Sequence, residues 1–205
     1  MPALLYEVST ADKPVKLKAG IAATFRVYEL SFSQLAEIVR RASMTLEYAK
    51  TQRAIRRQLQ VKAYDAGGTE IPIGDGELLQ LPRPLYARIT ENIDMNSGAP
   101  AGKIIADGDG LDHPLIFQLG TGINIGGDKA QVITDLEFQA KTGADIEDVL
   151  CETTGAGQAL TLIMTCATPL TKDLGLLRLP SWAVEQITEA DGMEIVTKVL
   201  PRFLS

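Results

Sequence analysis

The sequence predicts an α+β protein made of two tandem copies of one small unit, in which a β-hairpin or short strands precede helices. Residues 78–91 match residues 176–189 at an offset of 98, with seven of the fourteen positions identical. Residues 4–38 match residues 115–149 at an offset of 111, apolar on apolar and without a gap, in the same order along the chain. A period near one hundred residues indicates duplicated domains rather than a solenoid.

Each copy is expected to open with strands. In the first copy, residues 4–8 form an apolar run, and residues 23–30 alternate imperfectly between apolar and polar side chains. In the second copy, Val132, Leu136 and Phe138 repeat that phase. A period of two is typical of half-buried strands, so both copies are expected to begin with a hairpin.

A capped helix follows the strands in each copy. Ser31 or Ser33 can cap a helix over residues 34–42, and Thr142 can cap one over residues 144–152. Hydroxyl side chains at these positions accept a backbone N–H of the first helical turn. The helix of the second copy also carries acidic residues in its first turn, where the helix dipole favours them.

Further helices complete each copy. Residues 44–64 and 156–167 carry apolar stripes, and the second stripe stops before a proline, which disfavours helix at the residue preceding it. Pro82 and Pro180 stand at equivalent places where a helix can begin, because the first helical position needs no N–H. A last amphipathic helix is expected over residues 193–204.

A stretch rich in Gly, Pro, Ser and Asp separates the two copies. It comprises residues 94–102 and 106–110. Such composition is typical of a loop or linker. We therefore expect a first unit over residues 1–95, a linker over residues 96–112 and a second unit over residues 113–205.

The composition is that of an ordinary globular protein, with 45% apolar and 22% charged side chains in 205 residues. No apolar run approaches the length of a membrane span, and the N-terminus lacks the pattern of a secretion signal. These features predict no membrane partner and a location in the cytoplasm of the cell that makes the protein. Cys151 and Cys166 are expected to be buried free thiols, since structural disulfides are rare in that compartment.

Charge is divided unevenly between the halves. Residues 1–100 carry 13 Lys and Arg against 11 Asp and Glu, a net charge of +2. Residues 101–205 carry 7 against 15, a net charge of −8. Two copies of one fold with such different surfaces suit two different partners, or the two ends of a head-to-tail homo-oligomer.

Catalytic motifs do not emerge from the pattern. His113 is the only histidine, and neither a nucleophile elbow nor a Cys-His pair can be assembled around it. Residues 120–127 fit neither the dinucleotide-binding nor the P-loop spacing, so a glycine-rich turn between two strands is expected. The sequence therefore predicts no catalytic residue and no cofactor.

Three carboxylates near the linker are candidate metal ligands. Asp107, Asp109 and Asp112 are closely spaced but lack the glutamate of an EF-hand, which favours a solvated acidic loop without metal. The remaining enzyme hypothesis requires a ligand-binding pocket around His113, Asp112 and Asp135.

A basic stripe in the first copy raises the question of nucleic acid. The net charge of −6, the intervening Glu47 and the single interleaved aromatic residue, Tyr48, disfavour that partner and favour a protein-binding face. The stripe consists of Lys50, Arg53, Arg56 and Arg57, preceded by Arg40 and Arg41.

The second copy resembles the small tail assembly chaperones of Mu-like and related tailed bacteriophages. The resemblance spans residues 113–204 and extends faintly to the first copy. It rests on a strand that leads into an acidic helix start over residues 133–147, on Leu177-Arg178-Leu179-Pro180, and on a helix with Asp191 that leads to Val199-Leu200-Pro201-Arg202-Phe203-Leu204.

This resemblance implies a non-enzymatic role in which the protein binds tape-measure and tail-tube proteins in the host cytoplasm before the tail polymerises. Such a role requires an exposed apolar groove that accepts an amphipathic partner helix. The alternative is a structural component of the tail, neck or baseplate, present in the virion as a ring held by head-to-tail contacts. Candidate partner-binding residues are Leu46, Leu59, Leu85, Ile89, Ile163, Trp182, Ile187 and Phe203, with the basic residues Arg53, Arg56 and Arg57.

Overall fold

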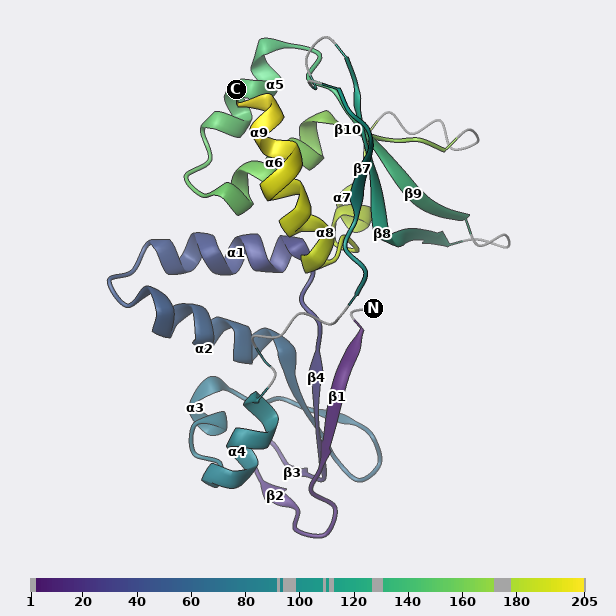
Figure 1. The fold of residues 1–205 in the computed structure, drawn as a ribbon. Helices are drawn as coiled ribbons and strands as arrows, with labels where there is room; N and C mark the ends of the chain where they lie inside the picture. Colours follow the sequence, from purple (N-terminus) through teal and green to yellow (C-terminus); the bar gives the residue numbers. More distant parts are fainter. Residues whose placement is uncertain are drawn as a thin grey trace. The chain divides into compact units, whose positions relative to one another are not determined.

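A computed structural model shows an α+β fold, which confirms the predicted fold class (Figure 1). The chain falls into two units. Unit 1 comprises Met1–Leu30 with Arg41–Ser97, and unit 2 comprises Ser31–Arg40 with Gly98–Ser205. The structure describes residues 3–91, 93, 99–108, 110, 113–126, 131–171 and 178–204.

Unit 1 contains a four-stranded antiparallel sheet in the order β1-β4-β5-β6 and a separate hairpin of β2 and β3. The alternation seen in the sequence buries Phe25 and Val27 on one face of β4, where they share a core with Leu78 and Ile89 from the helices. The strands are β1 (Leu4–Ser9), β2 (Val15–Lys16), β3 (Ile21–Ala22), β4 (Thr24–Tyr28), β5 (Val61–Tyr64) and β6 (Glu70–Ile71), and the helices are α2 (Tyr48–Gln60), α3 (Asp75–Leu78) and α4 (Arg83–Thr90).

Unit 2 contains a second antiparallel sheet, in the order β10-β9-β8-β7, with its helices gathered on one side (Figure 1). Phe117 and Phe138 of the sheet share a core with Leu162 and Ile195 of the helices. The strands are β7 (Lys103–Ala106), β8 (Leu115–Gly126), β9 (Gln131–Phe138) and β10 (Ala167–Pro169), and the helical segments are α5 (Gly143–Leu150), α6 (Gly155–Cys166), α7 (Ser181–Val184), α8 (Glu189–Glu194), the π-helix η1 (Ile195–Val199) and α9 (Leu200–Phe203).

The same order of elements recurs along the chain. Two antiparallel strands are followed by two helices and by a third strand that pairs with the second, as β1-β4-α1-α2-β5 and as β8-β9-α5-α6-β10, where α1 is Phe32–Ser43. The helices α1 and α5 begin 111 residues apart, at Phe32 and Gly143, which is the offset of the sequence match.

The pairing of the second and third strands recurs as well. Val27 lies opposite Val61 in one sheet, and Phe138 lies opposite Ala167 in the other. All four side chains are buried, and the two positions of β4 and β9 are again 111 residues apart. This recurrence is what a duplication would produce, and the duplication itself stays a prediction.

Helix α1 departs from the predicted domain boundaries. Its first residues were expected in a unit over residues 1–95, whereas Ser31–Arg40 belongs to unit 2. Ser31 forms a β-bridge with Thr188, and the backbone N–H of Phe32 donates to the Ile187 carbonyl oxygen at 2.8 Å. These bonds and the buried Phe32 ring hold the start of α1 in unit 2, so the predicted boundary was wrong here.

Three predicted elements also differ from the structure. The helix expected over residues 44–64 begins only at Tyr48, and its last four residues form β5, because Val61 and Ala63 alternate inward beside β4. The glycine-rich turn expected at residues 120–127 is part of β8 up to Gly126, and residue 127 lies outside the described residues.

The helix expected over residues 193–204 is interrupted by a π-helical turn. Pro201 has no N–H to continue the α-helical ladder, and the N–H of Leu200 donates instead to the Ile195 carbonyl oxygen. In the part of the chain that the structure describes, no helix combines the length and apolar character needed to cross a bilayer.

Candidate partner-binding surfaces

The connection between α1 and α2 exposes apolar side chains. Met44 is 72% exposed, Leu46 is 107% exposed and Tyr48 is 42% exposed. Local bonds explain the projection: the N–H and hydroxyl of Thr45 both donate to the Ala42 carbonyl oxygen as α1 ends. Burying a leucine side chain stabilises a protein by about 1.5–3 kcal/mol. A partner that covers this turn would therefore gain binding free energy.

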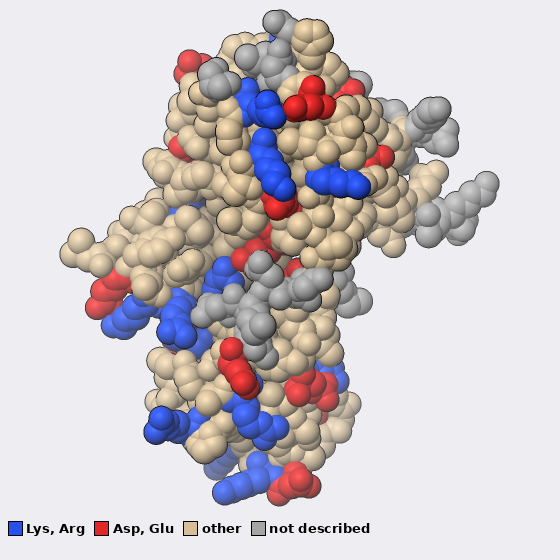
Figure 2. Space-filling model, in the orientation of Figure 1, with Lys and Arg blue, Asp and Glu red and all other residues tan. Residues whose placement is uncertain are grey.

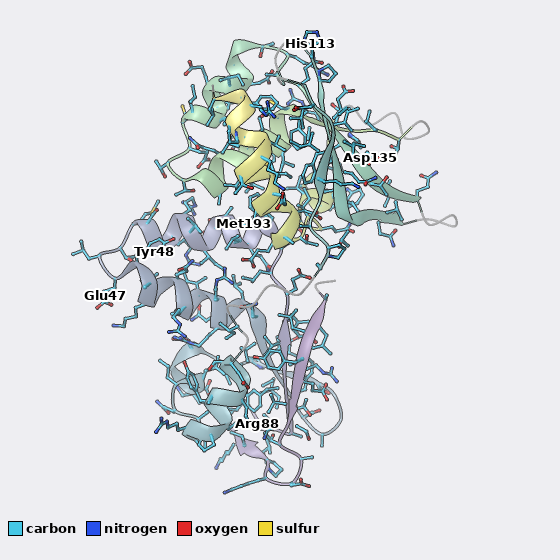
Figure 3. The ribbon with its side chains drawn as sticks, viewed as in Figure 1. Glu47, Tyr48, Arg88, His113, Asp135 and Met193 are labelled. Carbon is cyan, nitrogen blue, oxygen red and sulfur yellow. The ribbon has the colours of Figure 1, made fainter. Side chains whose placement is uncertain are left out.

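Basic side chains surround this turn, and we name residues 41–53 the basic turn. It carries Arg41, Lys50 and Arg53 against Glu47, a net charge of +2. The Lys50 ammonium lies 2.8 Å from the Glu47 carboxylate, and this bond raises the pKa of Lys50. Figure 2 shows basic side chains gathered over α2, and Figure 3 shows Glu47 and Tyr48 at its outer end.

Two of the predicted basic residues are largely covered by the protein. The guanidinium of Arg57 donates to both carboxylate oxygens of Asp75, at 2.6 and 3.0 Å, and the bond to Asp75 raises the pKa of Arg57. This pair fastens α2 to α3 within unit 1. Arg56 is only 9% exposed. Of the three predicted arginines, Arg53 alone is exposed.

The end of α5 in unit 2 is acidic, and we name residues 147–152 the acidic turn. It contains Glu147, Asp148 and Glu152 and no basic residue, a net charge of −3. Glu147 and Asp148 are exposed. Leu150, which lies between Asp148 and Glu152 in the sequence, is 52% exposed.

The nearby Asp145 is not part of that surface. Its carboxylate accepts the N–H and the hydroxyl of Thr142, at 2.9 and 3.0 Å. Thr142 is the N-cap residue of α5, as predicted, with its hydroxyl donating to Asp145. Burial acts to raise the pKa of Asp145, but these bonds and the N–H of Lys141 outweigh it and lower the pKa.

The helices of unit 2 expose further apolar side chains. Met164 on α6 is 50% exposed, Trp182 on α7 is 43% exposed and Met193 on α8 is 41% exposed. Helix α6 packs against both α7 and α8, so the three side chains come from one helical layer. Large exposed apolar groups on neighbouring helices are typical of protein-binding surfaces.

The remaining predicted residues divide by burial. Leu59 is 36% exposed, whereas Leu85 is half-buried against the core of unit 1. Four others were wrong as surface residues, because they fill the two cores: Ile89, Ile163, Ile187 and Phe203.

Among the described residues, the candidates for catalysis or metal binding do not come together. His113 and Asp135 lie well apart in unit 2 (Figure 3), and Asp109 and Asp112 lie outside the described residues. Asp107 pairs with Arg202, at 3.1 Å. Among the residues that the structure describes, no group of three His, Cys, Asp or Glu side chains is arranged to hold a metal ion.

The cysteines are both free, but only one is buried. Burial raises the pKa of the Cys166 thiol. Cys151 is exposed at the end of α5, so its predicted burial was wrong.

Sequence reasoning missed the buried carboxyl group of Asp191. This side chain is 0% exposed and accepts the N–H of Gly120 at 2.8 Å and the hydroxyl of Thr188 at 3.0 Å. Gly120 passes so close to Pro100 that a Cβ would lie 1.8 Å from its carbonyl oxygen, which explains a glycine here without any phosphate. The spacing Thr188-x-x-Asp191 before a helix was the available signal.

No protein-family model, no curated protein and no solved structure matches the chain.

Proposed function

We propose that the chain is a non-enzymatic phage morphogenesis protein that acts as a tail assembly chaperone, binding tape-measure and tail-tube proteins in the host cytoplasm. The family resemblance of residues 113–204 motivates the proposal, and all of that range belongs to unit 2. The observation that carries it is Trp182. This side chain is the only tryptophan and is 43% exposed on the first turn of α7.

The exposure of Trp182 is not required by the fold. The next two residues, Ala183 and Val184, are buried and attach α7 to the core. A tryptophan on the outside of such a helix adds little to the core but offers a large, rigid apolar surface to a partner. Tryptophan is enriched among the residues that dominate binding energy at protein interfaces.

The surrounding helices specify the kind of partner. Met164 and Met193 add flexible apolar side chains that adapt to different partner surfaces. Glu185 is exposed one turn from Trp182, and unit 2 is acidic as a whole. An amphipathic helix with apolar residues on one face and basic residues beside them fits this layer.

Replacing Trp182 with aspartate should weaken binding of the tail partners without unfolding the protein. The test co-expresses the chain with the tape-measure and tail-tube proteins of the same phage and measures co-purification and the soluble fraction of each partner. We expect the wild-type chain to retain at least one partner and the variant to lose about tenfold or more in affinity.

The matched control is Leu79→Asp in unit 1. Leu79 is 56% exposed, so this change places the same charge on an exposed apolar position that is not part of the helical layer of unit 2. Equal co-purification by the wild type and Trp182→Asp, or equal loss in both variants, contradicts the proposed role of this surface.

Mass spectrometry of purified virions separates a chaperone from a structural component. A chaperone acts before the tail is complete and should be missing from mature particles. Its presence in stoichiometric amounts would overturn the chaperone proposal and favour the alternative, a virion component of the tail, neck or baseplate.

A further inference from the structure

The basic turn and the acidic turn carry opposite charges. The basic turn runs from the end of α1 into the start of α2, and the acidic turn comprises the last residues of α5 and the two residues after it. Their net charges are +2 over residues 41–53 and −3 over residues 147–152. Surfaces of opposite charge are electrostatically complementary to each other.

Each turn also presents apolar surface. Leu46 is 107% exposed in the basic turn, and Met44 beside it is 72% exposed. Leu150 is 52% exposed in the acidic turn. Stable interfaces combine an apolar centre with a polar rim, and both turns contain the two parts.

Arg40, which precedes the basic turn, already has acidic partners within unit 2. The Arg40 guanidinium donates to both carboxylate oxygens of Glu37, at 2.8 and 2.9 Å, and Glu152 also acts to raise the pKa of Arg40. Arg41 and Lys50 on the basic turn, and Glu147 and Asp148 on the acidic turn, are placed to meet another molecule, although Lys50 must exchange its exposed pair with Glu47 to do so. All four are exposed.

We propose that the basic turn of one copy of this chain docks on the acidic turn of a second copy. Leu46 packs on Leu150, while Arg41 and Lys50 face Glu147 and Asp148. The two surfaces differ, so the contact is heterologous and leaves one free turn of each kind at the ends of a dimer. Further copies can add there, which produces short chains or a ring.

This self-association goes beyond the proposed function. It uses the two turns, whereas the proposed tail-protein site uses Trp182, Met164 and Met193 on other helices. The Trp182→Asp variant should therefore associate with itself as the wild type does, so failure of either proposal is distinguishable from failure of the other.

The test is sedimentation velocity of the full chain over a range of concentrations and salt. The wild type should form larger species as its concentration rises at low ionic strength, and these should diminish at high ionic strength, where opposite charges are screened. A single monomeric species at every concentration in low salt overturns the proposal and leaves the basic turn to a different partner.

Charge reversal tests the pairing. R41E/K50E removes the basic turn, and E147K/D148K removes the acidic turn, and each should weaken self-association about tenfold or more. Mixing the two variants should restore association, because the intact acidic turn of the first meets the intact basic turn of the second. No association in the mixture, or undiminished association of either variant alone, overturns the head-to-tail arrangement.

Two single variants complete the design. L46D should weaken association as strongly as charge reversal, because it removes the apolar centre and adds a like charge toward the acidic turn. R88E reverses an exposed charge on α4, away from the basic turn (Figure 3), and should leave association unchanged. Loss of association in R88E equal to that in R41E/K50E would show that only net charge matters and would overturn the proposal.

Discussion

Replacing Phe32 with alanine should lower the free energy of unfolding of unit 2 by about 3–5 kcal/mol. The Phe32 side chain is 0% exposed and belongs to the core of unit 2, although it lies before most of unit 1 in the sequence. Its removal leaves a cavity where α1 meets α8. The only tryptophan, Trp182, lies in unit 2, so its fluorescence follows the unfolding of this unit in denaturant.

Gly192 provides a sharper form of this experiment. A Cβ on Gly192 would lie 1.9 Å from Cδ2 of Phe32, so Gly192→Ala must displace the ring and should cost about 1–3 kcal/mol in the wild type. In the Phe32→Ala background there is no ring to displace. The same glycine replacement should then be neutral or stabilise α8 by up to about 1 kcal/mol, because alanine favours helix.

The change of sign in the effect of Gly192→Ala distinguishes direct packing of Phe32 on Gly192 from a low intrinsic stability of α8. If Gly192→Ala has the same effect on the free energy of unfolding with and without the Phe32 ring, the two residues are not coupled and the docking of α1 described above is wrong. Coupled neighbours give interaction energies of about 0.5–3 kcal/mol in such cycles.

Replacing Asp191 with alanine should destabilise unit 2 by about 3 kcal/mol. The carboxylate accepts the N–H groups of Gly120 and Thr121, at 2.8 and 3.4 Å, and the hydroxyl of Thr188 at 3.0 Å. Alanine leaves these donors without their acceptor in a site that excludes water. Loss of the Trp182 fluorescence transition at lower denaturant concentration measures the effect.

The pH dependence of this group has a defined sign. Burial raises the pKa of Asp191, and its bonds to Gly120, Thr188 and Thr121 oppose the rise only in part. The folded protein therefore keeps this proton at pH values where the unfolded chain has released it. The resulting stabilisation is fully present below about pH 4, the ordinary aspartate pKa, and is lost as the pH rises through the folded-state pKa.

Asp191→Asn isolates that contribution because the amide does not titrate. The free energy of unfolding of the wild type, relative to this variant, should fall as the pH rises above about 4 and then level off. A relative stability that rises with pH over this range would mean that the bonds to the carboxylate, rather than its burial, decide its pKa.

Local patterns were sufficient for most elements of the fold. Thr142 was expected to cap α5, and it does so through Asp145. The order of strands and helices could also be predicted, since periodicity and capping act within a few residues. A helix is predicted over residues 61–64 because Val61 and Ala63 fit both an apolar helical stripe and the alternation of a strand. Pairing with β4 makes this segment a strand.

Assignments that depend on distant contacts could not be made from the sequence. The place of α1 in unit 2 rests on Phe32 meeting Ile187 and Gly192, more than 150 residues away in the chain. The exposure of the candidate partner-binding residues could not be predicted for the same reason. Leu46 and Ile187 are both apolar residues beside helices, yet one is 107% exposed and the other is 0% exposed, because only the second has a partner element to cover it.

The path of the chain through the two units has a consequence for synthesis on the ribosome. Ser31–Arg40 is made early, but the rest of unit 2 begins only at Gly98. At about 5–20 residues per second, the remaining chain takes roughly 5–20 s to emerge. During that interval the apolar side chains of Phe32 and Leu35 have no core to enter, so the nascent chain should be most open to proteases and to aggregation while unit 1 is already complete in sequence.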